Sequence, residues 1–125
     1  MRAVVAVATL ALGASLAGCA GGGSSTAERL VPGGDPSRGA GLIEHYGCGS
    51  CHTIPGIAGA DGSVGPALSH FADERFIGGV IPNTVPNAIG WIQNPKRFAP
   101  RTIMPNLGVT GDQARDIAAY LYGRT

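Results

Sequence analysis

The first helix that the pattern of apolar and polar positions predicts covers residues 35–46. Its apolar side chains recur at the three- and four-residue spacing of one helix face: Leu42, Ile43 and Tyr46. Asp35 is a typical N-cap residue, and Pro36 fits the first helical position, where a missing N–H loses no partner. Gly47 then ends the helix.

Two more helices are predicted towards the C-terminus. Thr84, two residues before Pro86, indicates a helix start that leads into an apolar stretch. Thr110 and Gln113 have the spacing of a capping box and begin the last helix. The apolar face of this last helix repeats at helical spacing: Ala114, Ile117, Ala118, Tyr120 and Leu121.

The segments between these helices are rich in glycine and proline, which favours loops. Residues 53–66 and 95–109 are the two longest loops, and Asn94-Pro95 ends the second helix. Residues 67–74 have room for one or two helical turns. No segment shows a clear strand pattern. The predicted fold class is therefore all-α, with three to five short helices.

The N-terminal residues do not belong to this domain. Arg2 precedes an apolar run over residues 3–16, which is short for a membrane span and typical of an export signal. The run leads to Leu-Ala-Gly before Cys19, which resembles the lipobox of bacterial lipoproteins. That resemblance implies that residues 1–18 are a cleaved signal peptide and that Cys19 carries a lipid. An ordinary signal with cleavage nearby, for example after Ala20, is the alternative.

Residues 19–34 are rich in glycine and low in apolar content. We predict a lipid-anchored flexible Gly/Ser linker here and a folded domain over residues 35–125. Multiple acylation would hold the protein at a membrane of the bacterial cell envelope, facing the periplasm. Without residues 1–18 the chain has eight Lys+Arg and eight Asp+Glu residues. This balance argues against nucleic-acid binding, which needs a basic surface.

Cysteine and histidine residues indicate the chemistry of the chain. Cys48, Cys51 and His52 form Cys-x-x-Cys-His, the attachment motif of c-type haem. Two thiols at this spacing add to the two vinyl groups on one porphyrin edge, and the adjacent imidazole reaches the iron. A haem would also complete the core of a glycine-rich domain of about ninety residues, which buries limited apolar surface alone. We therefore predict one covalent haem c, with His52 as an iron ligand.

Three other uses of these residues are open. A thioredoxin-like redox pair shares Cys-x-x-Cys but needs a βαβ setting, and no strand pattern flanks the motif. A structural zinc site needs four ligands, and only His45 and His70 could complete it. A simple disulfide between Cys48 and Cys51 would leave His52 without a role.

Met104 is the predicted second iron ligand. Cytochrome c iron is bound by His and Met, and removal of the signal peptide leaves Met104 as the one methionine. It lies in a proline-bearing loop before the last helix, with Pro105 directly after it. The alternatives are a core methionine, bis-histidine ligation through His70, and a five-coordinate haem that binds ligands. His45 is expected on the solvent face of its helix.

Over residues 35–123 the chain resembles class I cytochrome c. Gly39 and Ile43 match the glycine and aromatic pair at which the first helix of that family crosses the last, with isoleucine here in place of phenylalanine. The segment around Pro66 is similar to a family loop whose proline carbonyl accepts a hydrogen bond from the ligand histidine. The resemblance thus implies that Pro66 orients His52.

A closer resemblance is to the cytochrome c domain fused to subunit II of some haem–copper oxidases. It rests on three segments: Ile81-Pro82-Asn83-Thr84, Trp91-Ile92-x-Asn94-Pro95 and Met104-Pro105-Asn106-Leu107-Gly108. The resemblance implies that Trp91 lies near a haem propionate, and a plain core aromatic is the alternative. We expect the chain to be that haem domain on its own, as a stand-alone lipoprotein without copper ligands or membrane helices.

These features predict an electron-transfer protein rather than an enzyme with a small-molecule substrate. It would carry one electron at a time in a respiratory chain, between a redox donor and an acceptor such as a terminal oxidase. Lys96, Arg97 and Arg101 could dock an acidic partner or be ordinary solvated charges. The alternatives are a haem-binding subunit of a larger redox complex and a peroxidase-like or gas-binding haem protein.

Overall fold

The computed structural model describes residues 26–124. The predicted signal peptide over residues 1–18 and the predicted lipidation site Cys19 lie outside the described residues. The described part contains five α-helices: α1 (Thr26–Leu30), α2 (Pro36–His45), α3 (Val85–Gln93), α4 (Pro95–Phe98) and α5 (Gly111–Tyr122). It also contains short 3-10 turns and an antiparallel hairpin of two strands: η1 (Cys48–Ser50), η2 (Phe71–Asp73), β1 (Phe76–Ile77) and β2 (Ile81–Pro82). The predicted all-α fold class is confirmed, and none of these helices is long and apolar enough to cross a membrane.

The helix starts follow the capping signals in the sequence. The Asp35 carboxylate accepts hydrogen bonds from the backbone N–H groups of Ser37 and Arg38, at 2.8 and 3.1 Å. At α5 the Thr110 hydroxyl accepts from the N–H of Gln113, whose side chain accepts in turn from the N–H of Thr110. These caps satisfy N–H groups that have no partner inside a helix, and both predicted helix starts are confirmed.

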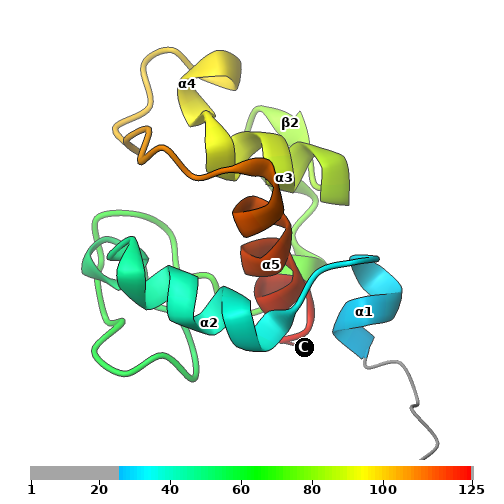
Figure 1. Ribbon diagram of the computed structural model, residues 1–125. Helices are drawn as coiled ribbons and strands as arrows, with labels where there is room; N and C mark the ends of the chain where they lie inside the picture. Colours follow the sequence, from blue (N-terminus) through cyan, green and yellow to red (C-terminus); the bar gives the residue numbers. More distant parts are fainter. Residues whose placement is uncertain (1–25, 125) are drawn as a thin grey trace, which may run out of the picture.

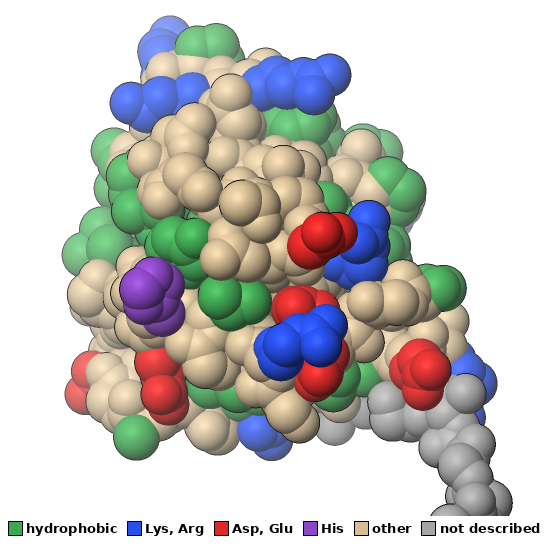
Figure 2. All heavy atoms as spheres, in the orientation of Figure 1, with side chains coloured by type: hydrophobic (Ala, Val, Ile, Leu, Met, Phe, Trp, Pro, Cys, Tyr) green, Lys and Arg blue, Asp and Glu red, His purple; other side chains and the backbone are tan. Residues whose placement is uncertain are grey.

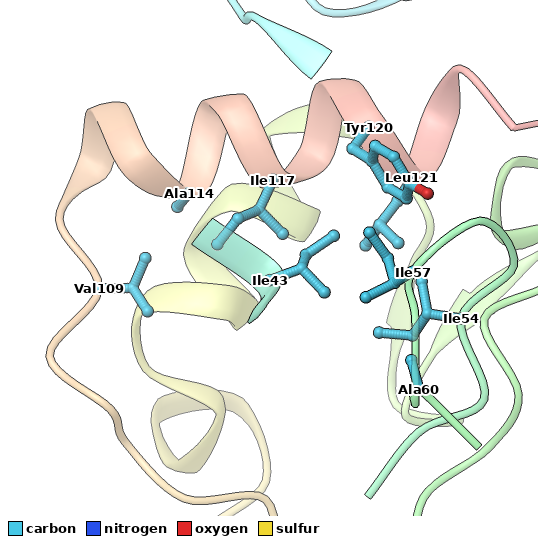
Figure 3. Packing of buried hydrophobic residues seen from close by; sticks show 9 residues of the cluster. All are labelled: Ile43, Ile54, Ile57, Ala60, Val109, Ala114, Ile117, Tyr120 and Leu121. Atoms are coloured by element: carbon cyan, nitrogen blue, oxygen red, sulfur yellow. The ribbon is translucent and has the colours of Figure 1, made fainter. Parts of the chain in front are cut away.

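Helices α2 and α5 cross at the centre of the fold, and their contact forms the larger core (Figure 1). A Cβ atom at Gly39 would collide with the backbone carbonyl of Asp116, so the two helices approach this closely only because residue 39 is glycine. One turn later Ile43, which is 1 % exposed, points towards Ile117 and Leu121 of α5 (Figure 3). The crossing that the family resemblance implied is therefore present.

An ion pair between α2 and α5 lies at the edge of their crossing. Asp116 is 6 % exposed, and its carboxylate accepts hydrogen bonds from Nε and Nη2 of Arg38 at 2.9 and 3.1 Å. The same carboxylate accepts a third bond from the N–H of Asp35 at 2.8 Å. The bonds from the Arg38 guanidinium lower the pKa of the Asp116 carboxyl from its ordinary value. The charged carboxylate therefore joins the start of α2 to α5.

The structure corrects the predicted linker at residues 26–34, which belong to the folded domain. Ala27 of α1 and the following Val31 are 5 % and 1 % exposed, and Val31 packs in one cluster with Ala119 of α5. At Gly34 a Cβ atom would lie 2.7 Å from the Cβ of Ala119, so the backbone here lies directly on α5. Two buried apolar residues in a polar segment are too few to produce a periodic signal in the sequence.

Helix α3 packs on α5, and α4 follows α3 with only Asn94 between them (Figure 1). The Thr84 hydroxyl caps α3 by accepting from the N–H of Asn87 at 3.4 Å, as predicted. Asn94 ends α3, and its side chain caps α4 by accepting from the N–H of Arg97 at 3.3 Å. The predicted loop over residues 95–109 thus begins with a helical turn, because the Asn-Pro pair that stops one helix also starts the next.

Candidate functional site

The Cys-x-x-Cys-His motif forms η1 and the residues directly after it. Gly47 has a φ of 67°, a conformation that suits glycine, and it reverses the chain between α2 and η1. The N–H groups of Cys51 and His52 then both donate to the carbonyl of Cys48, at 3.2 and 3.1 Å. This single turn holds the two thiols and the imidazole as one unit. Cys48 and Cys51 are not joined in a disulfide.

The imidazole of His52 is oriented by the loop that follows the motif. Its Nδ1 lies 2.7 Å from the carbonyl oxygen of Pro66. If Nδ1–H donates to this carbonyl, Nε2 is the ring nitrogen that keeps a lone pair. A Cβ atom at Gly65 would lie 2.7 Å from Nδ1 and collide with the ring. The backbone at Gly65 and Pro66 thus fixes both the tautomer and the orientation of His52.

Backbone hydrogen bonds tie this loop to the motif, and we call residues 47–68 the His52 side of the site. Three of these bonds cross between the two segments: Gly62 N–H to the Gly49 carbonyl, Gly65 N–H to Cys51 and Leu68 N–H to Thr53, at 3.0, 2.7 and 2.8 Å. An isolated bridge between Thr53 and Asp61 adds to them. The position of His52 therefore depends mainly on main-chain contacts.

The thiol of Cys48 lies in an apolar environment. Cys48 packs against the α2–α5 core, and burial raises the pKa of its thiol above the ordinary value. This apolar setting suits the edge of a porphyrin. In addition, no cluster of three or more His, Cys, Asp or Glu side chains within residues 26–124 could hold a metal ion. The described residues therefore give no support to a structural zinc site.

Met104 lies in the segment between α4 and α5, and we call residues 100–109 the Met104 side of the site. Its Sδ is 3.2 Å from Nε1 of Trp91, whose indole N–H donates to the sulfur. The backbone N–H of Met104 donates to the hydroxyl of Thr102 at 3.3 Å. The sequence analysis did not predict a role for Thr102. Ser and Thr hydroxyls often bond the backbone two residues further along in turns, which is the signal that could have pointed to it.

An apolar surface connects the two sides. Cys48 packs on the cluster around Ile43, and Met104 packs on the cluster around Trp91. Three half-buried apolar residues border both clusters: Phe71, Ile89 and Ile92. Further apolar side chains are exposed within the two sides: Val64, Ile103 and Leu107. Two thiols, an imidazole nitrogen and a thioether sulfur joined by an apolar surface fit the chemistry of a haem.

The other two histidines lie outside this arrangement. His45 is exposed on α2, as predicted. The side chain of His70 is 71 % exposed, and its Nδ1 lies 3.7 Å from the Asp73 carboxylate. This position gives no support to bis-histidine ligation through His70.

The basic residues of the candidate docking patch are exposed around α4. Figure 2 shows Lys and Arg side chains gathered at the upper end of the molecule, whereas the acidic side chains in this view lie lower. The patch consists of Lys96, Arg97 and Arg101, and each of them is exposed. Arg97 also lies over the Phe98 ring, with its guanidinium carbon 5.6 Å from the ring centroid.

The family model described as Cytochrome c matches residues 36–124 of the chain. This match includes both the His52 side and the Met104 side. Comparison with curated proteins gives no significant match.

Proposed function

Because the chain belongs to the cytochrome c family, we propose that it is a membrane-tethered one-electron carrier of a respiratory chain that works beside a terminal oxidase. As a member of this family it is an electron-transfer protein, and it binds one haem c covalently through Cys48 and Cys51. The haem iron supplies the redox chemistry by taking up and releasing one electron.

His52 and Met104 are the proposed iron ligands. The observation that carries this proposal is the hydrogen bond between Nδ1 of His52 and the carbonyl of Pro66, which leaves Nε2 to bind iron. Met104 is the one methionine after residue 1, and it lies on the apolar surface that reaches Cys48. Two protein ligands leave the iron no open position, which favours electron transfer over oxygen activation.

Carbon monoxide tests this ligand pair. The visible spectrum of the reduced wild-type protein is expected to stay unchanged when the gas is added, because Met104 occupies the sixth position. The Met104→Ala variant is the positive control and is expected to bind the gas. A prompt spectral change in the wild-type protein would contradict the proposal and favour the gas-binding alternative.

The tether is proposed to be a lipid on Cys19. Helix α1 of the folded domain includes Thr26, and six residues lie between Cys19 and Thr26. The seven Cα-to-Cα steps from Cys19 to Thr26 span at most about 25 Å. This maximum distance between the lipid-bearing residue and the domain is shorter than the distance that a linker over residues 19–34 would allow. The domain would therefore exchange electrons with partners that lie close to the membrane surface.

A Cys19→Ser variant tests the tether. The wild-type protein is expected in the membrane fraction, and the variant, with its haem retained, in the soluble fraction. Equal distribution of both proteins would contradict the lipid tether. Detergent extraction separates the carrier from the subunit alternative, because a subunit would elute with a partner oxidase in fixed ratio.

Charge distribution supports an acidic redox partner. Four basic residues lie within residues 75–111, and the eight acidic residues of the chain all lie outside this range. Three of the four basic residues form the patch at α4, in the segment that leads to Met104. A surface of one charge sign attracts partners of the opposite sign and speeds their encounter.

Small redox ions of opposite charge test this attraction. Oxidation of the reduced protein by hexacyanoferrate(III) is expected to slow as salt is added, since the Debye length falls to about 8 Å at physiological ionic strength. The variant Lys96→Gln/Arg97→Gln/Arg101→Gln should lose most of this salt dependence. The matched control, Arg29→Gln/Arg115→Gln/Arg124→Gln, makes the same change in net charge away from the patch. Equal loss in both variants would contradict a docking role for the patch.

A further inference from the structure

Helix α1, the start of α2 and the end of α5 meet at one end of the domain, and we call α1 with residues 36–40 and 120–124 the tether end. These segments line a groove of about 480 Å³. We propose that the tether end rests on the lipid bilayer and thereby points the basic patch at α4 away from the membrane. This inference rests on the proposed lipid at Cys19, and it goes beyond that proposal by giving the domain one orientation on the bilayer.

Apolar side chains of the tether end are open to the surroundings. The groove walls include four of them: Ala27, Pro36, Ala40 and Tyr120. On α1, Ala27 packs against the end of α5, where a Cβ atom at Gly123 would lie 3.0 Å from the Cβ of Ala27. Leu30, three residues after Ala27, is 43 % exposed. An apolar groove beside an exposed leucine fits the bilayer interface, where apolar side chains insert by about 5–10 Å.

Arg124 lies at the same groove and is held there by Tyr120. Its guanidinium carbon is 4.8 Å from the centroid of the Tyr120 ring, and its Nη2 donates to the Tyr120 hydroxyl at 2.8 Å. That hydroxyl donates in turn to the carbonyl of Pro55 at 2.7 Å. The guanidinium is therefore fixed beside an apolar surface. This arrangement suits a bilayer, because the apolar walls face acyl chains while the charge reaches the headgroups.

The lipid, rather than charge, determines which end of the domain meets the bilayer. The tether end carries charges of both signs: Glu28 and Arg29 are adjacent on α1, and Asp35 pairs with Arg38 at 3.3 Å. Anionic headgroups therefore attract the tether end less than the basic patch. The lipid outweighs this preference, because only six residues lie between Cys19 and α1.

Helix α5 separates the tether end from the basic patch. It has twelve residues, which makes it about 18 Å long. Its last turn borders the groove, and its first turn follows the Met104 side. Figure 1 shows α4 at the top of the molecule and α1 near its lower end, and Figure 2 shows Lys and Arg side chains gathered at the upper end. An acidic redox partner would therefore dock at a surface that stands about one helix length above the bilayer.

Fluorescent labels on the haem-loaded, lipidated protein test this orientation in phosphatidylcholine vesicles whose acyl chains carry bromine, which quenches nearby labels. A bimane label on Leu30→Cys is expected to lose at least about half of its emission relative to vesicles without bromine, because it lies at the bilayer interface. Leu107→Cys is the matched control, since Leu107 is a leucine of similar exposure, 40 %, on the Met104 side. Its label should lose almost none. Cys48 and Cys51 take no label because they hold the haem.

Three results would overturn the proposal. Equal quenching of the two labels would mean that the domain has no fixed orientation on the bilayer. Stronger quenching at Leu107, without or with added anionic phosphatidylglycerol, would place the other end of the domain on the membrane. No quenching at either position, with the protein in the membrane fraction, would mean that the domain is held off the bilayer while the tether stands. A protein found in the soluble fraction would remove the lipid tether itself, and this outcome separates the two failures.

Discussion

The two sides of the site differ in what holds them. On the His52 side, main-chain hydrogen bonds join residues 47–53 to residues 62–68, and the Pro66 carbonyl orients the ring. On the Met104 side, the methionine is held by side chains, the indole of Trp91 and the hydroxyl of Thr102. In Figure 1 the His52 side forms the loop beyond the end of α2, and the Met104 side runs from α4 to the start of α5. Backbone hydrogen bonds across the loop join the segments of the His52 side to each other.

This difference assigns separate roles to the two ligands. A main-chain scaffold tolerates changes in most side chains, so the His52 side should keep the haem attached and oriented. A loop held by two side-chain contacts opens at lower cost, so ligand exchange and tuning of the potential should occur on the Met104 side. Substitutions on the two sides should therefore change different measurements.

The largest effect is expected from Gly65→Ala on the His52 side. The new Cβ would collide with the His52 ring, and neither the ring nor the bonded backbone can move easily. We expect the free energy of unfolding of the haem-loaded protein to fall by about 3 kcal/mol. Gly41→Ala is the control, because a Cβ there meets no atom within 4 Å; it should be neutral or stabilising by about 0.5 kcal/mol. Denaturant unfolding followed by haem absorbance measures both, and equal losses would contradict the scaffold role of Gly65.

Amide hydrogen exchange compares the two sides without substitution. The N–H groups of Gly62, Gly65 and Leu68 are bonded to backbone carbonyls, whereas the N–H of Met104 is bonded only to a side chain. We expect the first three amides to exchange at least about 100-fold more slowly than that of Met104. Similar protection on the two sides, measured by NMR, would show that the two sides open together.

Some of this arrangement could be predicted from the sequence because its signals are local. The capping box at Thr110 and the N-cap at Asp35 each occupy a few consecutive residues, and both form as expected. The Cys-x-x-Cys-His motif is equally local, and its residues form a single turn. The position of Pro66 at His52 came from the family resemblance, and the structure has that hydrogen bond.

The features that the sequence did not reveal depend on contacts between distant residues. The bond from Trp91 to the Met104 sulfur depends on how α3, α4 and the following loop pack together. The ion pair of Arg38 and Asp116 joins residues 78 positions apart. The packing of residues 26–34 on α5 rests on single apolar residues such as Val31, which carry no periodic signal.

Acid should loosen the crossing that supports the His52 side. The Asp116 pKa is lowered by Arg38 in the folded protein, so the charged pair stabilises the fold above the ordinary Asp pKa of about 3.9. That contribution is lost as the pH falls through the lowered folded value. We expect the Tm to drop below about pH 4, and to drop less steeply in Asp116→Asn. Parallel Tm curves for the two proteins would remove Asp116 from this role.

The smallest effect is expected from Thr102→Val on the Met104 side. This change removes the hydroxyl that accepts from the N–H of Met104, so imidazole should displace Met104 about fivefold faster. Thr53→Val is the matched control, because it removes a hydroxyl that donates to the Gly62 carbonyl at 3.1 Å on the His52 side. The control should leave the displacement rate unchanged. Equal acceleration in both variants would mean that the two sides are not held differently.

Ligation of a covalent haem c by His52 and Met104 is tested most directly by the weak long-wavelength absorption band that a methionine sulfur produces when bound to ferric haem. The wild-type protein is expected to show this band, and Met104→Ala to lose it, with the haem still attached through Cys48 and Cys51. A wild-type protein without the band, or a Met104→Ala variant that keeps both the band and the reduction potential, would contradict Met104 as the second ligand.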